Sequence, residues 1–215
     1  MYDAVKRLLD IIGAIVASIL FLPIFIFLPI VIALDSGLPI FYCPIRVGKN
    51  GKLFQMIKFR SMRMYSVPGK QQHADTALKR DKELLASYKK NSYKLPEDPR
   101  ITTVGRMMRK SSLDEFPQFW NVIRGEMSLV GPRAYLPNEL LEQQDAFPHT
   151  KPLVRIMLTG KPGLTGPWQV SGRSNINFDK RIVLDVEYLK RRSFLYDIWM
   201  ILKTFPALLT GRGAV

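Results

Sequence analysis

The chain has 215 residues, and its 32 Lys and Arg against 18 Asp and Glu give a net charge of +14. This length accommodates one domain with a sizeable core, and the charge indicates an anionic partner such as nucleic acid, an anionic membrane surface or a phosphorylated ligand. The single cysteine, Cys43, excludes an internal disulfide, and His73 and His149 stand far apart in the sequence. Neither a structural zinc site nor a histidine-based triad is indicated, and cysteine usage favours a reducing compartment.

The segment from Ile11 to Leu34 is uncharged and apolar, and as a straight helix of roughly 36 Å it would cross a bilayer. A cleaved signal peptide fits poorly, because the apolar run is too long and no small-x-small cleavage site follows it. Pro23 and Pro29 interrupt the run, which disfavours a straight rod. Positive residues flank both ends, and positive flanks favour the cytoplasmic side. We expect a re-entrant helix-break-helix over residues 1–36, bent near Pro23, with an ordinary spanning helix as the alternative.

Residues 37–215 are expected to form a mainly helical domain on the cytoplasmic side, which makes the whole chain an α+β protein. Apolar and aromatic runs on both sides of an Asn-Gly pair at 50–51 predict a β-hairpin between Pro39 and Phe59. The charge-rich stretch 64–98 is predicted to be a surface insertion with one helix over 75–91.

Helical periodicity recurs through the rest of the domain. It predicts helices over 101–110, 112–124, 136–147, 178–192 and 193–210. In the second of these the predicted core residues are Leu113, Phe116, Trp120 and Ile123. The last is apolar and aromatic with few charges, which indicates either a helix at the headgroup level of a membrane or ordinary core packing.

Two adjacent carboxylates, Asp114 and Glu115, follow a basic run and precede a second motif, Gly131-Pro132-Arg133. One interpretation is structural, because Ser112 and Glu115 have the spacing of a capping box and acidic residues are favoured in a first helical turn. The other is catalytic, since a carboxylate pair among cations suits phosphate chemistry that uses a metal ion. An Arg on a stiff turn suits a pair of phosphate oxygens, although an exposed Arg after a turn is equally compatible.

A further segment, Lys161–Arg173, is rich in Gly, Pro and hydroxyl groups. Such a loop can bring backbone N–H groups to a diphosphate. It lacks both the Walker spacing and the G-x-G-x-x-G spacing, so neither nucleotide-binding fold is implied.

Several motifs together resemble a known family. The stretches Asp98–Thr102, Ser112–Gln118, Gly125–Arg133 and Lys161–Gly166 resemble the bacterial sugar transferases, the monotopic polyprenyl-phosphate hexose-1-phosphate transferases or phosphoglycosyl transferases. The resemblance covers nearly the whole chain. It implies transfer of a sugar-1-phosphate from a UDP-sugar to undecaprenyl phosphate with release of UMP, as the first membrane step of exopolysaccharide, O-antigen or capsule synthesis. The implied location is the bacterial inner membrane, with the catalytic domain facing the cytoplasm.

The resemblance also implies roles for individual residues. It places the catalytic dyad on Asp114 and Glu115, with Asp114 forming a covalent phosphosugar intermediate, and the membrane break on Pro23. Both carboxylates are the expected Mg²⁺ ligands, because a metal ion reconciles a negative nucleophile with negative phosphates. The expected phosphate-binding cations are Lys58, Arg60, Arg109, Arg133 and Arg173. The family usually has Pro where this chain has Ala134, which leaves the stiffness of the Arg133 turn open.

Two other functions compete with this one. A membrane-tethered nucleic-acid binder has the right charge, but no helix-turn-helix, RRM-like aromatic pair or zinc ligand set is present, so no nucleic acid is expected. The alternative is a catalytically inactive scaffold of a polysaccharide assembly complex, against which both carboxylates and Arg133 argue. The sequence identifies neither the sugar, for which galactose or glucose is expected, nor the oligomeric state, a homodimer included. The insertion at 75–91 also favours the catalytic unit of a larger transferase.

Overall fold

The computed structural model describes residues 2–67, 70–74, 78, 81–90, 95, 98–172 and 176–209. Its helices are α1 (Tyr2–Leu20), α2 (Leu22–Ser36), α4 (Lys82–Lys90), α5 (Thr103–Ser111), α6 (Gln118–Arg124), α7 (Pro137–Ala146), α8 (Lys151–Met157), α9 (Pro167–Val170), α10 (Phe178–Arg191) and α11 (Phe194–Leu209). Short 3₁₀ turns are η1 (Lys49–Gly51), η2 (Leu113–Glu115) and η3 (Pro148–Thr150). The strands are β1 (Phe41–Tyr42), β2 (Ile45–Val47), β3 (Leu53–Gln55), β4 (Lys58–Phe59), β5 (Met64–Val67), β6 (Lys70–His73), β7 (Ser128–Val130) and β8 (Gly163–Thr165).

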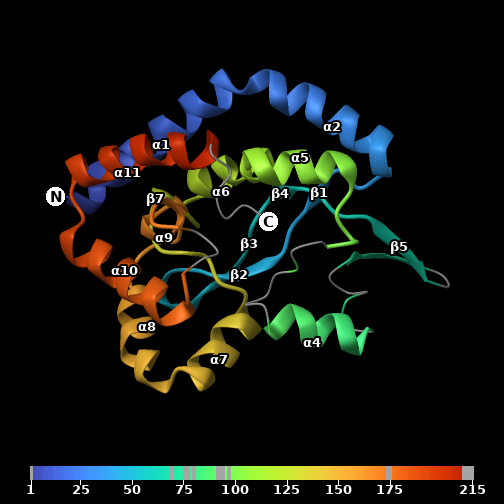
Figure 1. Cartoon of the computed structure of the whole chain (residues 1–215). Coiled ribbons are helices and arrows are strands. Elements are labelled where there is room, and N and C mark those ends of the chain that lie inside the picture. The colour runs from blue at the N-terminus through green and yellow to red at the C-terminus, as the bar shows by residue number, and fades with distance from the viewer. Residues whose placement is uncertain are drawn as a thin grey trace.

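This mainly helical α+β architecture is the one that the sequence predicts. Helix pair α1–α2 arches over one side of the molecule, α5, α6 and α11 run close beneath it, and α7, α8 and α10 lie on the opposite side (Figure 1). The strands pair as β1–β4, β2–β3, β5–β6 and β7–β8, and only the last pair is parallel among the described residues. The β5–β6 hairpin extends away from the helical layers at one edge of the molecule (Figure 1).

The two N-terminal helices meet at a sharp bend of 61°. The break lies at Phe21, and Pro23 occupies the first turn of α2, where a missing N–H loses no helical hydrogen bond. Pro29 lies inside α2 without ending it. No single described helix is long and apolar enough to cross a membrane, whereas the bent pair together passes that test of length and composition. The predicted helix-break-helix near Pro23 is therefore confirmed.

Polar contacts fix α1 to the rest of the chain. Asp10 is buried, and its carboxylate accepts hydrogen bonds from Ser128 Oγ at 2.8 Å and the Leu129 backbone N–H at 3.0 Å. Arg7 donates to two of the last carbonyl groups of α6, where the helix dipole favours a cation. Asp197 on α11 accepts hydrogen bonds from side chains of both α1 and α10. The helix pair is thus held in a defined orientation on the domain.

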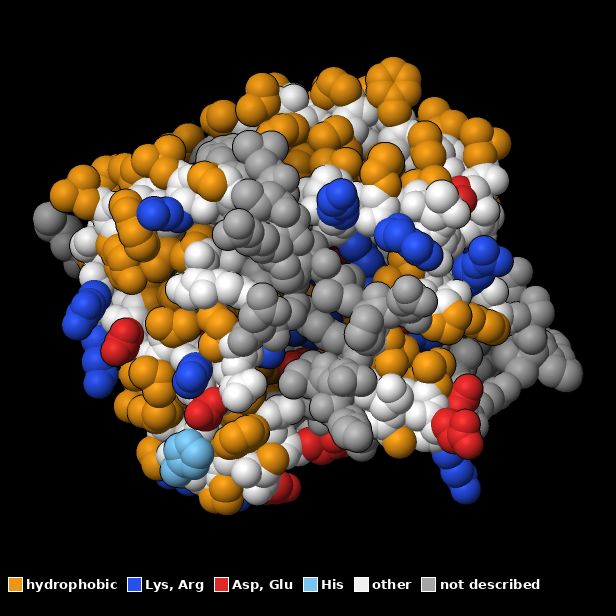
Figure 2. Space-filling view, viewed as in Figure 1, with side chains coloured by type: hydrophobic (Ala, Val, Ile, Leu, Met, Phe, Trp, Pro, Cys, Tyr) orange, Lys and Arg blue, Asp and Glu red, His pale blue; other side chains and the backbone are white. Residues whose placement is uncertain are grey.

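An apolar face covers the outer side of this layer. Figure 2 shows hydrophobic side chains gathered over the region where α1 and α2 run. The exposed members are Val5, Leu8, Ile12, Ile15, Val16, Ile19 and Leu20 on α1, Leu22, Ile26, Phe27, Ile30, Val31 and Leu34 on α2, and Phe194, Leu195, Ile198, Trp199 and Leu202 on α11. Water-soluble monomers rarely expose a contiguous apolar patch of this size, so the surface marks a membrane or partner interface.

The predicted β-hairpin is confirmed. Strands β2 and β3 pair antiparallel with Val47 opposite Leu53, and β1 and β4 continue the pairing with Phe41 opposite Phe59. The connection contains Asn50 at φ 56° and Gly51 at φ 77°, the left-handed conformations that an Asn-Gly turn supplies. The hairpin delivers Lys58 from its exit strand.

The surface insertion differs from the prediction. An antiparallel hairpin of β5 and β6 occupies residues 64–67 and 70–73, which the sequence did not predict. Within the predicted helix over 75–91, Leu78 is helical, Asp81 is not, and α4 begins at Lys82. Residues 75–77, 79–80 and 91 of the predicted helix lie outside the described residues.

The predicted helix over 112–124 is divided into η2 and α6. Ser112 ends α5 in the left-handed conformation with φ 56°, and its side chain makes no capping hydrogen bond, so the capping-box interpretation is wrong. The 3₁₀ turn has fewer residues per turn than an α-helix, which changes the phase of the apolar stripe. Phe119 and Val122 are consequently buried, whereas Trp120 is 52% exposed and was wrongly placed in the core. Helix α6 ends at Gly125, as predicted.

Arg60 lies at the end of α2 instead of beside the carboxylates. It is 1% exposed and donates hydrogen bonds to the backbone carbonyls of Ser36 at 2.8 Å, Gly37 at 2.6 Å and Leu38 at 3.3 Å. A guanidinium here satisfies carbonyl groups that the ended helix leaves open. The resemblance placed Arg60 with Lys58 among the phosphate-binding cations, but β4 ends at residue 59 and the Arg60 guanidinium is directed to the end of α2.

Replacing Arg60 with Met is therefore expected to destabilise the fold by about 3 kcal/mol, because three backbone carbonyl groups at the end of α2 lose a charged donor that is itself buried. Thermal unfolding in detergent measures the effect. Arg63 is exposed, so Arg63→Met is the matched control and should unfold with the wild type. Equal melting temperatures for the two variants would contradict the assigned role of Arg60.

Candidate active site

Lys58 brings the two carboxylates of η2 together. Its Nζ atom, on β4, donates a hydrogen bond to Glu115 Oε1 at 2.8 Å and lies 3.8 Å from Asp114 Oδ2. The Glu115 side chain retains 31% of its accessibility, whereas that of Asp114 retains 11%. One long cation therefore reaches both acids, although the two carboxylates belong to neighbouring residues of a helical turn, whose side chains point in different directions.

The environment of Asp114 disfavours its charged form. Burial raises the pKa of Asp114, and the neighbouring Glu115 carboxylate adds to the increase, while Lys58 and Arg109 oppose it. Arg109, on α5, is held by a hydrogen bond from its Nε to Ser61 Oγ at 2.9 Å. Two of the predicted phosphate-binding cations, Lys58 and Arg109, therefore act electrostatically on Asp114. A carboxyl group whose pKa is shifted by burial and by neighbouring charges is typical of functional sites.

A small cavity of about 70 Å³ adjoins the Glu115 carboxylate. Lys58, Glu115 and Arg133 line it together with Trp168. The Arg133 guanidinium carbon lies 4.4 Å from the centre of the Trp168 ring, a cation–π contact that fixes its orientation. The structure therefore brings Arg133, predicted to bind phosphate, to the same cavity as Lys58 and Glu115, and Lys58 also lies 3.8 Å from Asp114.

Arg46, which the sequence analysis missed, lines the same cavity from β2. Burial and the nearby Arg133 lower the pKa of Arg46, while Glu139 opposes this. Glu139 also lies 3.8 Å from Arg133 Nη2. One carboxylate therefore interacts electrostatically with two neighbouring guanidinium groups. In sequence Arg46 reads as an ordinary outward-facing strand residue between Ile45 and Val47, and only the folded hairpin reveals its position.

Four side chains around the cavity carry buried polar atoms with no hydrogen-bond partner among the described residues. They are Arg46 Nε, Gln118 Nε2, Arg133 Nε and Gln169 Oε1. Buried polar atoms are nearly always satisfied in folded proteins. Their concentration around one cavity indicates a polar ligand, and the arginines indicate an anionic one.

The turn that carries Arg133 is held by its backbone. Gly131 N–H donates to Thr165 O at 2.9 Å, and Gly163 N–H donates to Pro132 O at 2.9 Å. A Cβ atom on Gly131 would lie 2.3 Å from a backbone oxygen, so only glycine fits. These two backbone hydrogen bonds and the close packing of Gly131 keep the turn stiff without a proline after Arg133. It also engages the Gly163 N–H, one of the loop groups predicted to face a diphosphate.

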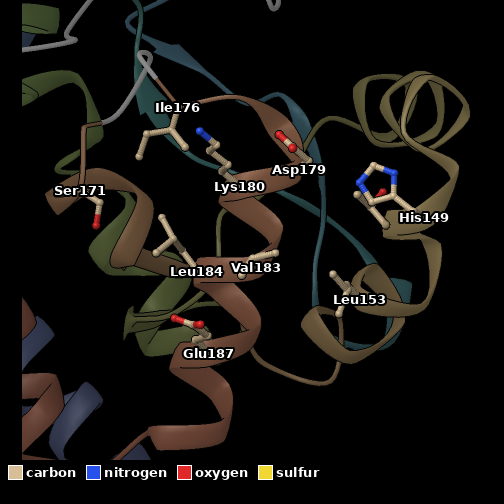
Figure 3. A pocket seen from close by; sticks show the side chains of 10 residues that line it. His149, Leu153, Ser171, Ile176, Asp179, Lys180, Val183, Leu184 and Glu187 are labelled. Atoms are coloured by element: carbon tan, nitrogen blue, oxygen red, sulfur yellow. The ribbon is translucent and has the colours of Figure 1, made fainter.

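A larger cavity of about 470 Å³ lies elsewhere, between η3, α8 and α10. Figure 3 shows His149 opposite Asp179 and Lys180, with Glu187 farther along α10. None of the described predicted site residues lines it. Size alone does not identify a catalytic site, and the convergent charged groups favour the smaller cavity. Arg173 lies outside the described residues, so its predicted role stays a prediction.

Comparison with known proteins decides the family. The profile described as Bacterial sugar transferase matches residues 1–211. The chain belongs to the bacterial sugar transferase family. The resemblance carried by the dyad, the Arg133 turn and the Lys161–Gly166 stretch is thereby confirmed.

Several named proteins are similar to this sugar transferase. The "Undecaprenyl-phosphate galactose phosphotransferase" of Salmonella typhimurium is 42% identical over 97% of this chain and 41% of its own length. The "UDP-galactose-lipid carrier transferase" of Erwinia amylovora is 40% identical over 97% of this chain and 41% of its own length. The "Exopolysaccharide production protein ExoY" of Sinorhizobium fredii is 38% identical and is covered over 87% of its length. The chain thus spans about two fifths of the length of the first two relatives.

The dyad of this sugar transferase fits a magnesium ion shared with substrate. Among the described residues, no group of three or more His, Cys, Asp or Glu side chains forms a metal cage. Mg²⁺ is commonly held by one or two carboxylates together with substrate phosphates. Glu115 meets this requirement, because its carboxylate lines the same cavity as Arg46 and Arg133, with Asp114 adjacent in the chain.

Proposed function

We propose that the chain transfers a sugar-1-phosphate from a UDP-sugar to undecaprenyl phosphate and releases UMP. The observation that carries the proposal is a carboxylate pair held by Lys58 beside a cavity with two arginines and unsatisfied polar groups. The names of the Salmonella and Erwinia relatives both specify galactose, which supports a hexose as the sugar. An inactive scaffold would have no need to keep these charges together.

The reaction proceeds in two displacements at one phosphorus atom. A carboxylate oxygen of Asp114 attacks the phosphorus that bears the sugar, and the bond from that phosphorus to the bridging oxygen breaks. UMP leaves with the bridging oxygen. A phosphate oxygen of undecaprenyl phosphate then attacks the same phosphorus, the bond to Asp114 breaks, and the carboxylate is restored. Dividing a transfer into two covalent steps is ordinary nucleophilic catalysis.

The surrounding side chains bind and orient the diphosphate. Arg133 and Arg46 hold its oxygens, because each guanidinium has an unpartnered buried Nε at the cavity. Lys58 favours the anionic form of Asp114 and so opposes burial, which raises the pKa of that carboxyl group. A Mg²⁺ ion bound at Glu115 and Asp114 would supply charge neutralisation to the phosphates. Charge stabilisation of this kind is commonly the largest contribution to phosphoryl transfer.

The membrane arrangement follows from the apolar face and the bend. Helices α1 and α2 enter one leaflet as a re-entrant pair and return at Phe21 and Pro23, and α11 lies at the headgroup level. This monotopic placement in the bacterial inner membrane puts the catalytic domain on the cytoplasmic side. The acceptor phosphate lies in the headgroup plane, so a catalyst embedded in one leaflet meets both a lipid and a soluble substrate.

Release of UMP from a panel of UDP-sugars tests this function. We expect release that requires undecaprenyl phosphate for multiple turnovers and that stops when Mg²⁺ is chelated. A purified protein that is folded but releases no UMP from any UDP-sugar would support the scaffold instead.

The pH dependence of UMP release is also expected to reflect the buried nucleophile. Since the pKa of Asp114 is raised and the reaction needs the carboxylate, activity should fall on acidification at a higher pH than an ordinary aspartate would dictate. Replacing Lys58 with Met removes the largest opposing influence, so the acidic limb should move to still higher pH. An unchanged limb in that variant would contradict the proposed coupling between Lys58 and Asp114.

A further inference from the structure

A second charged cavity lies at the beginning of α1. Its volume is about 380 Å³, and it shares no described lining residue with the cavity beside the dyad. The cations that line it are Lys6, Arg7, Lys49, Lys161 and Arg192, and the acids are Asp3 and Asp10. We call this space the α1 cavity. Its charge is not used by the proposed transfer reaction.

Internal pairing neutralises only part of that charge. Lys6 lies 2.7 Å from Asp197 and 3.5 Å from Asp10. Arg192 lies 3.1 Å from Asp3. The three other cations of the α1 cavity make no ion pair within the described part of the chain. The cavity therefore presents a surplus of positive charge.

Two of the unpaired cations converge over Gly125. A Cβ atom built on this glycine would lie 3.2 Å from Arg7 Nη2 and 3.4 Å from Lys161 Nζ. Burial lowers the pKa of Lys161, and the nearby Arg7, Lys49 and Lys6 lower it further, with Asp10 opposing. Like charges held this close repel one another, and an anion placed between them would relieve the repulsion.

The position of the α1 cavity favours a lipid as the source of that anion. The cavity includes the first turns of α1, the helix whose exposed Val5 and Leu8 begin the apolar face. In Figure 1 this end of α1 lies beside α11, which exposes Phe194 and Leu195. A phosphate at this edge can be bound while its acyl chains lie along apolar side chains. A soluble phosphate would gain the charge contact alone.

We propose that the α1 cavity binds the phosphate group of an anionic glycerophospholipid. Arg7 and Lys161 contact the phosphate from two sides, and Lys49 adds charge at the rim. Arg7 is already oriented by its hydrogen bonds to the end of α6, so little entropy is lost on binding. The bound lipid would fix the depth of α1 relative to the headgroup plane.

Binding of a short-chain lipid to the whole 215-residue chain in detergent tests this proposal. The probe is dioctanoyl phosphatidylglycerol, with dioctanoyl phosphatidylcholine and inorganic phosphate as comparison ligands, and affinity is read from isothermal titration. The variant is Lys49→Gln with Lys161→Gln. We expect saturable binding of phosphatidylglycerol by the wild type and about thirtyfold weaker binding by the variant. Each of the two lysines near an anionic headgroup contributes about fivefold to the affinity.

A matched control loses the same charge elsewhere. Lys52 and Lys151 are exposed and do not line the α1 cavity, so Lys52→Gln with Lys151→Gln should bind as the wild type does. Equal weakening in both double variants would reveal non-specific attraction and overturn the proposal. Inorganic phosphate binding as tightly as the lipid would overturn the lipid as the source. Asp114→Asn should bind the lipid normally, so this outcome is independent of the proposed catalysis.

Discussion

Replacing Asp114 with Asn is expected to lower the rate of UMP release at least about 10⁴-fold, the scale of effect found when a covalent nucleophile is removed. Asn preserves the shape of the side chain, but its amide oxygen cannot form a stable acyl phosphate. The loss should appear in the first displacement, before any lipid acceptor is needed. Single-turnover release of UMP without undecaprenyl phosphate therefore measures it most directly.

A control for this variant changes an aspartate that the site does not use. The Asp145 side chain is 79% exposed, and in the described structure its only ion pair is with Lys151. Asp145→Asn should retain full activity. Near-normal UMP release by Asp114→Asn would mean that another group attacks the phosphorus, and the proposed covalent chemistry would have to be abandoned.

Arg133→Met is expected to reduce turnover by about 10²- to 10³-fold, the effect of removing one preorganised charge donor from a developing anion. Met fills similar space and keeps an apolar contact with Trp168, but it offers no donor to the phosphate. Steady-state rates with saturating UDP-sugar measure the loss. Lysine should restore only part of the activity, because it lacks the planar fork that Trp168 orients.

The matched control for Arg133 is an arginine that also stacks on a tryptophan. Arg124 lies 5.4 Å from the Trp120 ring centre on the exposed side of α6. Arg124→Met removes a guanidinium and a cation–π contact without touching the cavity, so it should leave turnover unchanged. Equal losses in both variants would indicate a general effect of charge or folding.

Much of the fold could be predicted because its signals are local. The hairpin follows from alternation around Asn50-Gly51, the break of the first helix from Pro23, and the end of α6 from Gly125. The helices over 136–147, 178–192 and 193–210 were predicted within a few residues. Each depends on periodicity or on a residue with restricted backbone freedom, and both can be read from neighbouring positions.

The remaining features depend on contacts between distant segments. The left-handed Ser112 divides a helix that looks continuous in sequence, which moved Trp120 outward. The contact between Arg60 and the end of α2 could not be predicted, because the two are more than twenty residues apart in the sequence. Arg60 was therefore assigned to phosphate. Arg46 was not predicted as a site residue, because it reaches the cavity only when the hairpin folds against the Arg133 turn. Charged residue types alone do not distinguish a helix cap from a ligand contact.

The most direct test of the account is intact-protein and peptide mass spectrometry after incubation with a UDP-sugar in the absence of undecaprenyl phosphate. We expect a phosphosugar adduct on Asp114, formed together with one equivalent of UMP and discharged when the lipid acceptor is added. An adduct on a different residue, or UMP release that begins only with the acceptor and leaves no adduct, would contradict the central claim.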